Sequence, residues 1–459
     1  MNRALRGGLR ALTGIVIVAV AAALAVFAGN ASLPSVMRDP VAVQVDTRQT
    51  GERELVCAGS FAQLGTDAQD PGAAVPSGAT TTVIAGDPLG QRELLRERDG
   101  GTAPTVLRAA IGTPFAAAQT QSVRTTDLRG LTAQSCVEPV NEQWLVGGST
   151  AVGASTTLNL GNPSEKPATV ELALFDEKGR IDSALTSGVL VPAGSERIVP
   201  LNGYAPGRDR LAVRVVSTGA AVSASLGVGQ VDGLQSFAID TVTRQLAPST
   251  RLAVPGVANP GDGDDAGPTD ADHLDEFPVL VRALSAEGTP GTARVSALFN
   301  GSAAQELGEI ELSGAEVGEL EVKHWPADAI AVVIDADVPI VGGVLGTAAG
   351  NRRHDTAWFT PAPALPAGTP VAAAVAGGSL VLANPGDADA LVTVGAGEAE
   401  RDYRVPAGTA LTVQAAADSR IVSDAPIHAG VVLASGGDIA GYPVLAEHET
   451  STTLTVYPR

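Results

Sequence analysis

The chain has 459 residues, more than one ordinary hydrophobic core accommodates, so its length predicts about three domains. Hydrophobic residues make up 44% of the sequence, which is enough to fill packed cores and argues against disorder along the whole chain. The formal net charge of -20 disfavours nucleic acid and anionic lipid as partners, because both repel an acidic surface.

The first segment of the chain has the pattern of an export signal or a membrane anchor. Three arginines among the first ten residues precede an uncharged run, rich in Ile, Val and Leu, from Ala11 to Ala28. A basic flank followed by about 18 apolar residues is typical of both kinds of segment. The positive-inside rule keeps the arginines in the cytoplasm and places the rest of the chain outside.

We therefore expect a basic cytoplasmic tail at residues 1–10 and a transmembrane or signal-anchor helix at residues 11–29. The rest of the chain is then an ectodomain held at the outer face of the cell membrane. Signal peptidase prefers small residues such as Ala28 and Ala31, and cleavage after either one gives a secreted protein instead. The sequence leaves both outcomes open.

Residues 30–140 are interpreted as an N-terminal β region that is bracketed by the two cysteines of the chain, Cys57 and Cys136. An even pair in an exported protein favours a disulfide, because the compartment is oxidising. Two isolated cysteines without neighbouring histidines do not make a zinc site. Alternating stretches at residues 41–45 and 80–84 predict strands, and residues 92–98 predict one or two helical turns.

From Trp144 onward the sequence repeats itself. A Leu-x-Leu-x-Asn-Pro segment at residues 158–163 recurs at residues 380–385, and Val-Pro-Ala-Gly-Ser at residues 191–195 recurs as Val-Pro-Ala-Gly-Thr at residues 405–409. Asn hydrogen-bonds its local backbone and Pro cannot donate to a ladder, so Asn-Pro is expected to end a strand. Pro-Ala-Gly is typical of a turn between neighbouring strands.

A third, more divergent copy lies between these two. It keeps an Ala-Leu-Phe segment at residues 297–299 that matches residues 173–175, but it lacks the Asn-Pro turn. Each copy predicts about six or seven short strands with one buried and one solvated face, which is typical of an immunoglobulin-like sandwich. A propeller blade is shorter and usually richer in aromatic residues.

The predicted fold class is therefore all-β, with tandem immunoglobulin-like β-sandwiches after the N-terminal helix. The expected sandwiches span residues 141–256, 257–365 and 366–459. An acidic linker at residues 259–272 opens the second one, and it lacks the spaced oxygens and the bidentate Glu of a calcium loop.

Each sandwich should have its own core. In the first we expect five side chains to face one interior: Val170, Leu172, Leu174, Val213 and Val215. In the last sandwich we expect the same of Leu391 and Val422.

A search for chemistry finds no catalytic, cofactor-binding or metal-binding residues. The sequence contains no Gly-x-Ser-x-Gly elbow and no phosphate-binding loop, and its histidines lack metal-binding spacing. The histidines are His273, His324, His354, His428 and His448. The three indoles lie near predicted domain edges, where packing at a junction is expected rather than a sugar platform. They are Trp144, Trp325 and Trp358. We therefore expect that the chain is not an enzyme.

The N-terminal span, the cysteine-bracketed region, Trp144-Leu145-Val146-Gly147-Gly148 after Cys136, and the Leu-x-Leu-x-Asn-Pro segment occur together in this order. This combination resembles an actinobacterial envelope-protein family that is catalogued as domain of unknown function 5719, and the resemblance covers nearly the whole chain. It implies an extracytoplasmic location and a β-sandwich structure. It transfers no catalytic or binding residue.

The leading hypothesis is a non-catalytic extracytoplasmic scaffold or interaction protein of the bacterial cell envelope. Its expected partners are envelope proteins or cell-wall glycans, with the membrane reached through the N-terminal helix and with no nucleic acid and no cofactor. The alternatives are a cell-wall carbohydrate-binding module, which the scarcity of Tyr and Trp weakens, and an enzyme with an unrecognised site. The sequence does not identify the ligand, the pathway or the oligomeric state.

Overall fold

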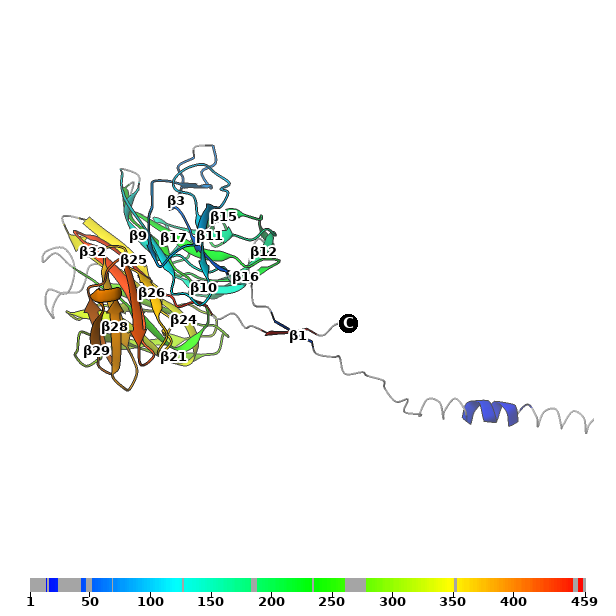
Figure 1. The fold of residues 1–459 in the computed structure, drawn as a ribbon. Helices are drawn as coiled ribbons and strands as arrows, with labels where there is room; N and C mark the ends of the chain where they lie inside the picture. The colour runs from blue at the N-terminus through cyan, green and yellow to red at the C-terminus, as the bar shows by residue number, and fades with distance from the viewer. Residues whose placement is uncertain are drawn as a thin grey trace, which may run out of the picture. The chain divides into compact units, whose positions relative to one another are not determined.

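In a computed structural model the chain folds mainly into β-strands, which confirms the all-β fold class (Figure 1). The structure describes residues 14, 16–23, 43–46, 52–67, 69–125, 128–182, 188–232, 235–260, 278–350, 353–448 and 453–456. Two compact units are present. One contains residues 1–48 and 449–459, and the other contains residues 49–448.

The smaller unit contains a helical segment and a two-stranded sheet. Residues 14 and 16–23 are helical, within the helix predicted at residues 11–29, whose other residues and the basic tail lie outside the described part of the chain. Across the described residues, no helix has the length and apolar character that a membrane span requires. Strand β1 (Val43–Asp46) pairs antiparallel with β34 (Thr453–Val456), and it overlaps the strand predicted at residues 41–45.

The larger unit is built from four repeats, which we number in chain order. Repeat 2 has two antiparallel sheets. The first sheet contains β10 (Glu142–Val146), β16 (Ala212–Thr218), β12 (Ala168–Asp176), β13 (Gly179–Ile181) and β14 (Val189–Val191). The second contains β15 (Ser195–Pro200), β11 (Ala154–Asn162), β17 (Ser223–Asp232) and β18 (Gln235–Val242), and a short 3-10 helix, η1 (Leu201–Gly203), follows β15.

Repeat 4 has the same order of strands. Its first sheet contains β26 (Val371–Ala374), β31 (Asp418–Ser423), β28 (Ala390–Gly395) and β29 (Arg401–Val405), with the 3-10 helix η2 (Gly397–Ala399) before β29. Its second sheet contains β30 (Thr409–Val413), β27 (Ser379–Asn384), β32 (His428–Ser435) and β33 (Asp438–Pro443). The two clear sequence copies therefore share one topology.

Repeat 3 joins its two halves through one long strand. Its strands are β19 (Ser249–Pro255), β20 (Val279–Ser285), β21 (Gly291–Phe299), β22 (Gln305–Leu312), β23 (Gly318–Val322), β24 (Ala329–Gly350) and β25 (Arg353–Phe359). The first half of β24 pairs with β19 and β21, and the second half pairs with β20 and β25. The pairing matches that of repeats 2 and 4, with the counterparts of β16 and β17 fused into one strand.

Repeat 1 is a shortened copy that the sequence pattern did not reveal. Its sheets are β2 (Glu52–Cys57), β7 (Thr105–Ala110) and β6 (Gly90–Glu93), and β5 (Thr81–Ala85), β8 (Ala116–Arg124) and β9 (Arg129–Ser135). A hairpin of β3 (Ala62–Leu64) and β4 (Ala74–Pro76) is inserted after β2. The order β2-β7-β6 corresponds to β10-β16-β12, and β5-β8-β9 corresponds to β11-β17-β18. The described residues of repeat 1 contain no counterpart of β15.

The helical turns predicted at residues 92–98 are wrong. Strand β6 runs to Glu93, and Leu95 forms a parallel bridge with Ser195 of repeat 2. The Leu95 N–H donates to Gly194 O, and Leu95 O accepts the N–H of Glu196. Pairing with a distant strand therefore overrides the local helical propensity of this segment.

The recurring asparagines fasten each turn, as their position before Pro predicts. Asn162 Nδ2 donates to the carbonyl oxygens of Lys166 at 2.8 Å and Val191 at 3.1 Å. Asn384 Nδ2 donates in the same way to Ala388 O and Val405 O. Each buried amide thus ties the Asn-Pro turn to the start of the Pro-Ala-Gly turn.

The predicted core positions are right for repeat 2 and wrong for repeat 4. All five side chains expected in repeat 2 lie in one buried cluster, which includes Leu172. In repeat 4, Leu391 is 51% exposed, whereas Val392, Val394 and Ile421 are buried. In repeat 4 the buried positions lie one residue away from the expected ones, and a shift of one residue exchanges the two faces of a strand. Val422 is accordingly only half-buried.

The last strands of the four repeats meet at the centre of the larger unit. Strand β9 packs against β18 and β33, and β25 packs against the same two strands, so the repeats close a ring. The approach is close, because a Cβ on Gly130 of β9, where φ is +139°, would lie 2.6 Å from the backbone nitrogen of Ile239. Repeats 1 and 4, which are the first and last of the chain, are therefore neighbours.

Neighbouring repeats also pack sheet against sheet. One apolar cluster joins Trp144, Phe175 and Ala212 of repeat 2 to Leu284 and Val341 of repeat 3. A second cluster joins repeat 3 to repeat 4 through residues that include Ala253 and Leu298 on one side and Val381 and Ala383 on the other. The sheet faces that point away from the core of each repeat are therefore buried between neighbouring repeats at these two junctions.

Candidate functional site

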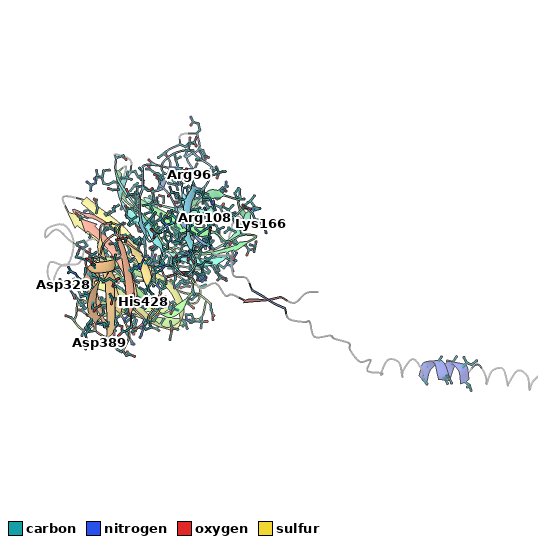
Figure 2. All side chains as sticks on the ribbon, viewed as in Figure 1. Arg96, Arg108, Lys166, Asp328, Asp389 and His428 are labelled. Carbon is teal, nitrogen blue, oxygen red and sulfur yellow. A yellow bond between two sulfur atoms is a disulfide. The ribbon has the colours of Figure 1, made fainter. Side chains whose placement is uncertain are left out.

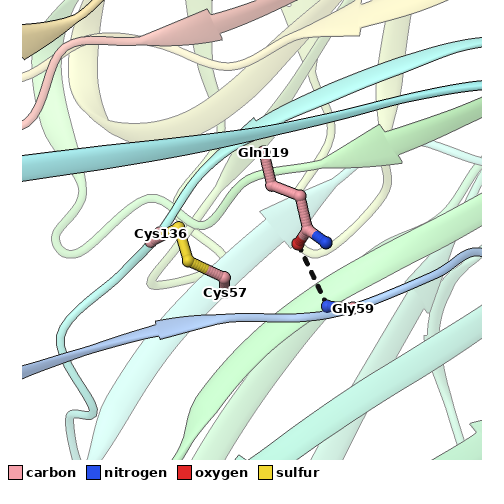
Figure 3. Close-up of a disulfide and its surroundings, with 4 residues drawn as sticks. All are labelled: Cys57, Gly59, Gln119 and Cys136. Carbon is pink, nitrogen blue, oxygen red and sulfur yellow. Dashed lines mark hydrogen bonds between the residues drawn. A yellow bond between two sulfur atoms is a disulfide. The ribbon is translucent and has the colours of Figure 1, made fainter. Parts of the chain in front are cut away.

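The predicted disulfide between Cys57 and Cys136 is present (Figure 3). Cys57 ends β2 and Cys136 directly follows β9, so the bond joins the two sheets of repeat 1. Beside it, the N–H of Gly59 donates to Gln119 Oε1 at 3.0 Å. Repeat 1 lacks one strand and has a small core, and a disulfide is a usual way to stabilise such a core.

Four of the five histidines, His324, His354, His428 and His448, lie among the described residues of the larger unit. Among the described residues no group of three or more His, Cys, Asp or Glu side chains is placed to hold a metal ion. His428 (Figure 2) lies between repeats 4 and 3, where Nδ1 contacts Ala362 O at 2.8 Å and burial lowers its pKa. His273 and nearly all of the acidic linker lie outside the described residues.

Two aspartates occupy the central strands, where sequence analysis singled out no site. Asp240 lies on β18 and accepts the backbone N–H of Trp358 on β25. Asp355 lies on β25, and its Oδ2 accepts the N–H groups of Ile439 at 3.0 Å and Leu131 at 3.2 Å. Asp355 therefore connects repeat 3 to repeats 4 and 1 at once.

Hydroxyl groups also link neighbouring repeats at this centre. Thr241 Oγ1 donates to Ala133 O at 3.2 Å, and Thr360 Oγ1 donates to Thr243 O at 2.9 Å. Ser135 Oγ donates to Pro443 O. The central strands are the edge strands of their sheets, so side chains rather than a shared ladder satisfy backbone groups along these edges.

The two carboxyl groups are almost sealed from solvent, with Asp240 2% and Asp355 1% exposed. Burial raises the pKa of both groups well above the usual value, and hydrogen bonds from backbone N–H groups oppose the shift. The charge of Asp355 raises the pKa of Asp240 further, and Asp438 acts in the same direction on Asp355. Because a catalytic carboxyl group must reach a substrate, this geometry fits a structural use.

The sequence around Asp240 and Asp355 contains a pattern that could have indicated their role. Both aspartates are followed by Thr and stand next to apolar residues, as Ala238-Ile239-Asp240-Thr241-Val242 and Asp355-Thr356-Ala357-Trp358-Phe359. A carboxyl group at a buried strand position requires partners, and here they come from other repeats.

Arg282 fastens repeat 3 to repeat 2. Its side chain donates to Gly148 O at 2.6 Å and to Asp209 O at 2.9 Å, and it forms an ion pair with Glu319 at 2.6 Å. The guanidinium group also lies 4.6 Å from the centre of the Trp358 ring. Arg282 is thus a buried cation whose charge and hydrogen bonds are used within this junction.

The indoles are buried, with Trp144, Trp325 and Trp358 each 3–4% exposed. Trp144 stacks on Phe175 in the cluster between repeats 2 and 3, and Trp358 of β25 enters the core of repeat 2. These two confirm the predicted packing at junctions. Trp325 instead lies in the core of repeat 3.

A surface pocket of about 180 Å³ lies between repeats 1 and 2. The β3–β4 hairpin and residues 97–98 line one side, and β15 lines the other. Its charged groups pair within the chain: Arg98 contacts Asp67 and Asp70, and Arg197 contacts Glu97.

The buried ion pair of Arg96 and Glu196 lies at the same junction (Figure 2 labels Arg96). Its N–O distance is 2.8 Å. Burial raises the pKa of Glu196 to about 7, although Arg96 opposes the shift. The charges of the pocket are thus largely neutralised internally.

A family model described as a family of unknown function, DUF5719, matches residues 95–416. No curated protein matches the chain, and no solved structure matches it either.

Proposed function

We propose, given that the chain belongs to the DUF5719 family of unknown function, that it is a non-catalytic scaffold or interaction protein of the bacterial cell envelope. In this proposal the N-terminal apolar segment anchors the chain in the cell membrane, and residues 49–448 are exposed outside the cytoplasm. The partners are envelope proteins. Each repeat is an immunoglobulin-like sandwich that serves as a framework for loops and strand edges.

The main support for the proposal is that buried polar side chains hold neighbouring repeats together through hydrogen bonds. Asp240, Asp355 and Arg282 all bind backbone groups of a neighbouring repeat. Groups of this kind form active sites when they converge on a cleft, whereas here they close junctions. In this proposal recognition falls to the outer surface of the larger unit, because a packed framework that presents loops and strand edges is typical of interaction proteins.

The disulfide supports the location, because such bonds persist in oxidising compartments and are rare in the cytosol. The burial of Trp144, Trp325 and Trp358 disfavours the carbohydrate-binding alternative, since sugar platforms need exposed rings. No described aromatic side chain is among the exposed large apolar residues. Envelope proteins are therefore better supported as partners than cell-wall glycans.

In-cell photocrosslinking tests this proposal. A photoreactive amino acid replaces exposed residues of the full-length chain one at a time, for example Lys166 and Val152. We expect discrete adducts with envelope proteins from at least one position, and none from a photoreactive group at the buried Leu160. An absence of adducts from every exposed position would contradict the interaction function.

A further inference from the structure

Repeat 1 leaves one strand edge open that the other repeats fill. In repeat 2 the second strand, β11, pairs with β17 on one side and β15 on the other. The corresponding strands β20 and β27 also have two neighbours each. Among the described strands, β5 of repeat 1 pairs with β8 alone, and residues 69–125, all described, contain no strand on its other side.

Beside the open edge, the side chains on the core-facing side of β5 are more exposed than their counterparts in other repeats. The two leucines of the Leu-x-Leu segment that face the core from β11 and β27 are fully buried in both repeats. At the corresponding face of β5, Thr82 is exposed and Ile84 is only half-buried against the cluster around Cys57. A strand beside β5 would cover both side chains, as β15 covers the leucines of β11.

The edge also lacks the usual protection against strand addition. Residues 80–85 read Thr-Thr-Thr-Val-Ile-Ala, without charge and without Pro. The edge strand β29 of repeat 4, in contrast, carries Arg401, Asp402 and Arg404. β-Branched residues favour strands, and an uncharged free edge is a template for another strand.

We propose that the free edge of β5 binds an extended segment of a partner polypeptide, which supplies the strand that repeat 1 lacks. This inference rests on the proposed interaction function and places one binding site for it. Main-chain hydrogen bonds to β5 provide affinity, and side chains that alternate toward the core provide specificity.

The chain itself shows what such a segment looks like. Strands β15, β23 and β30 occupy the corresponding position in repeats 2, 3 and 4, and all three run antiparallel to their neighbour. Both β15 and β30 follow Pro-Ala-Gly, begin with a small hydroxylated residue and place a buried Val at the fifth position. We therefore expect an uncharged or weakly charged partner segment, antiparallel to β5, with a small first residue and a β-branched fifth residue.

A labelled synthetic peptide with the sequence of residues 405–415 is a direct probe, because it contains β30 and its turn. We expect saturable binding to the full-length protein by fluorescence anisotropy, and slower hydrogen exchange at residues 81–85. A Thr82→Pro variant should weaken binding at least tenfold. The matched control is Asp402→Pro on the charged edge strand β29, which should leave the affinity within twofold.

The outcomes separate this inference from the proposed function. Absence of saturable binding, or protection at residues other than 81–85, would overturn the site at β5 whether or not Thr82→Pro folds. A wild-type dimer that Thr82→Pro converts to a monomer would show that a second copy fills the edge, which also overturns it. Crosslinks from Lys166 without any from Thr82 would remove the β5 site and leave the interaction function standing.

Discussion

Replacement of Asp355 tests whether the centre of the ring depends on side-chain hydrogen bonds. Its carboxyl group accepts three backbone N–H groups, from Thr356, Ile439 and Leu131. In an Asp355→Leu variant all three lose their acceptor at a site that is 1% exposed. Each unsatisfied buried group costs about 1–3 kcal/mol, so the total is about 3–9 kcal/mol, comparable to the whole stability of a domain.

Asp355→Asn is the matched control. Its amide oxygen has two acceptor sites and a similar shape, so it keeps at least part of the network. We expect chemical denaturation near pH 4, followed by circular dichroism, to show that the Leu variant is largely unfolded or strongly destabilised. At this pH the carboxyl group is protonated in the folded protein, so the Asn variant should be close to wild type. A Leu variant as stable as the wild type would refute the structural role of the carboxyl group.

The difference in stability between wild type and Asp355→Asn should depend on pH, and the sign of this dependence is defined. Burial raises the pKa of Asp355 above its value of 3.8 in the unfolded chain, so the folded protein keeps a proton that the unfolded chain releases. The stabilisation is complete below about pH 3.8 and is lost as the pH rises through the folded pKa. In this window wild type should lose about 1.4 kcal/mol per pH unit relative to Asp355→Asn. A difference that is independent of pH from 4 upward would contradict burial of the carboxyl group.

Three further predictions follow from the fold. Removing the disulfide by a Cys57→Ser and Cys136→Ser double substitution should destabilise repeat 1 by about 2–4 kcal/mol, and non-reducing peptide mapping of wild type should recover the linked pair. Leu172→Asp should unfold repeat 2 by burying an unpaired charge, whereas Leu391→Asp should change stability by no more than about 0.5 kcal/mol, and limited proteolysis distinguishes the two. A reporter that is active only in the cytoplasm should be silent when fused after Arg459, and a strong signal there would reverse the proposed topology.

The repeats are predictable because their signals are local, and the disulfide is predictable because the chain has only two cysteines. Asn162 and Asn384 bond to backbone groups a few residues away and to the following turn, so their sequence context is the same in both copies. The pairing of Cys57 with Cys136 needed no geometry, since a chain with two cysteines allows a single intramolecular pairing.

The errors come from interactions between distant segments. Repeat 1 was not recognised as a copy because it has lost both the Asn-Pro turn and the strand that corresponds to β15. Leu95 pairs with a strand of the next repeat, which no local propensity indicates. Closure of the ring depends on Asp355 contacting Leu131, 224 residues earlier in the chain. Such contacts are set by packing rather than by periodicity.

The four repeats form one closed body, and crosslinking between repeats 1 and 4 can measure this closure in solution. Arg124 of β8 forms an ion pair with Asp438 of β33, although 314 residues separate them in the sequence. In a Cys57→Ser, Cys136→Ser background, cysteines replacing these two residues should be joined efficiently by a short bismaleimide within one molecule. A control pair at positions 124 and 404, at the outer edge of repeat 4, should not. Equal crosslinking of both pairs, or none at positions 124 and 438 in folded protein, would contradict a closed ring.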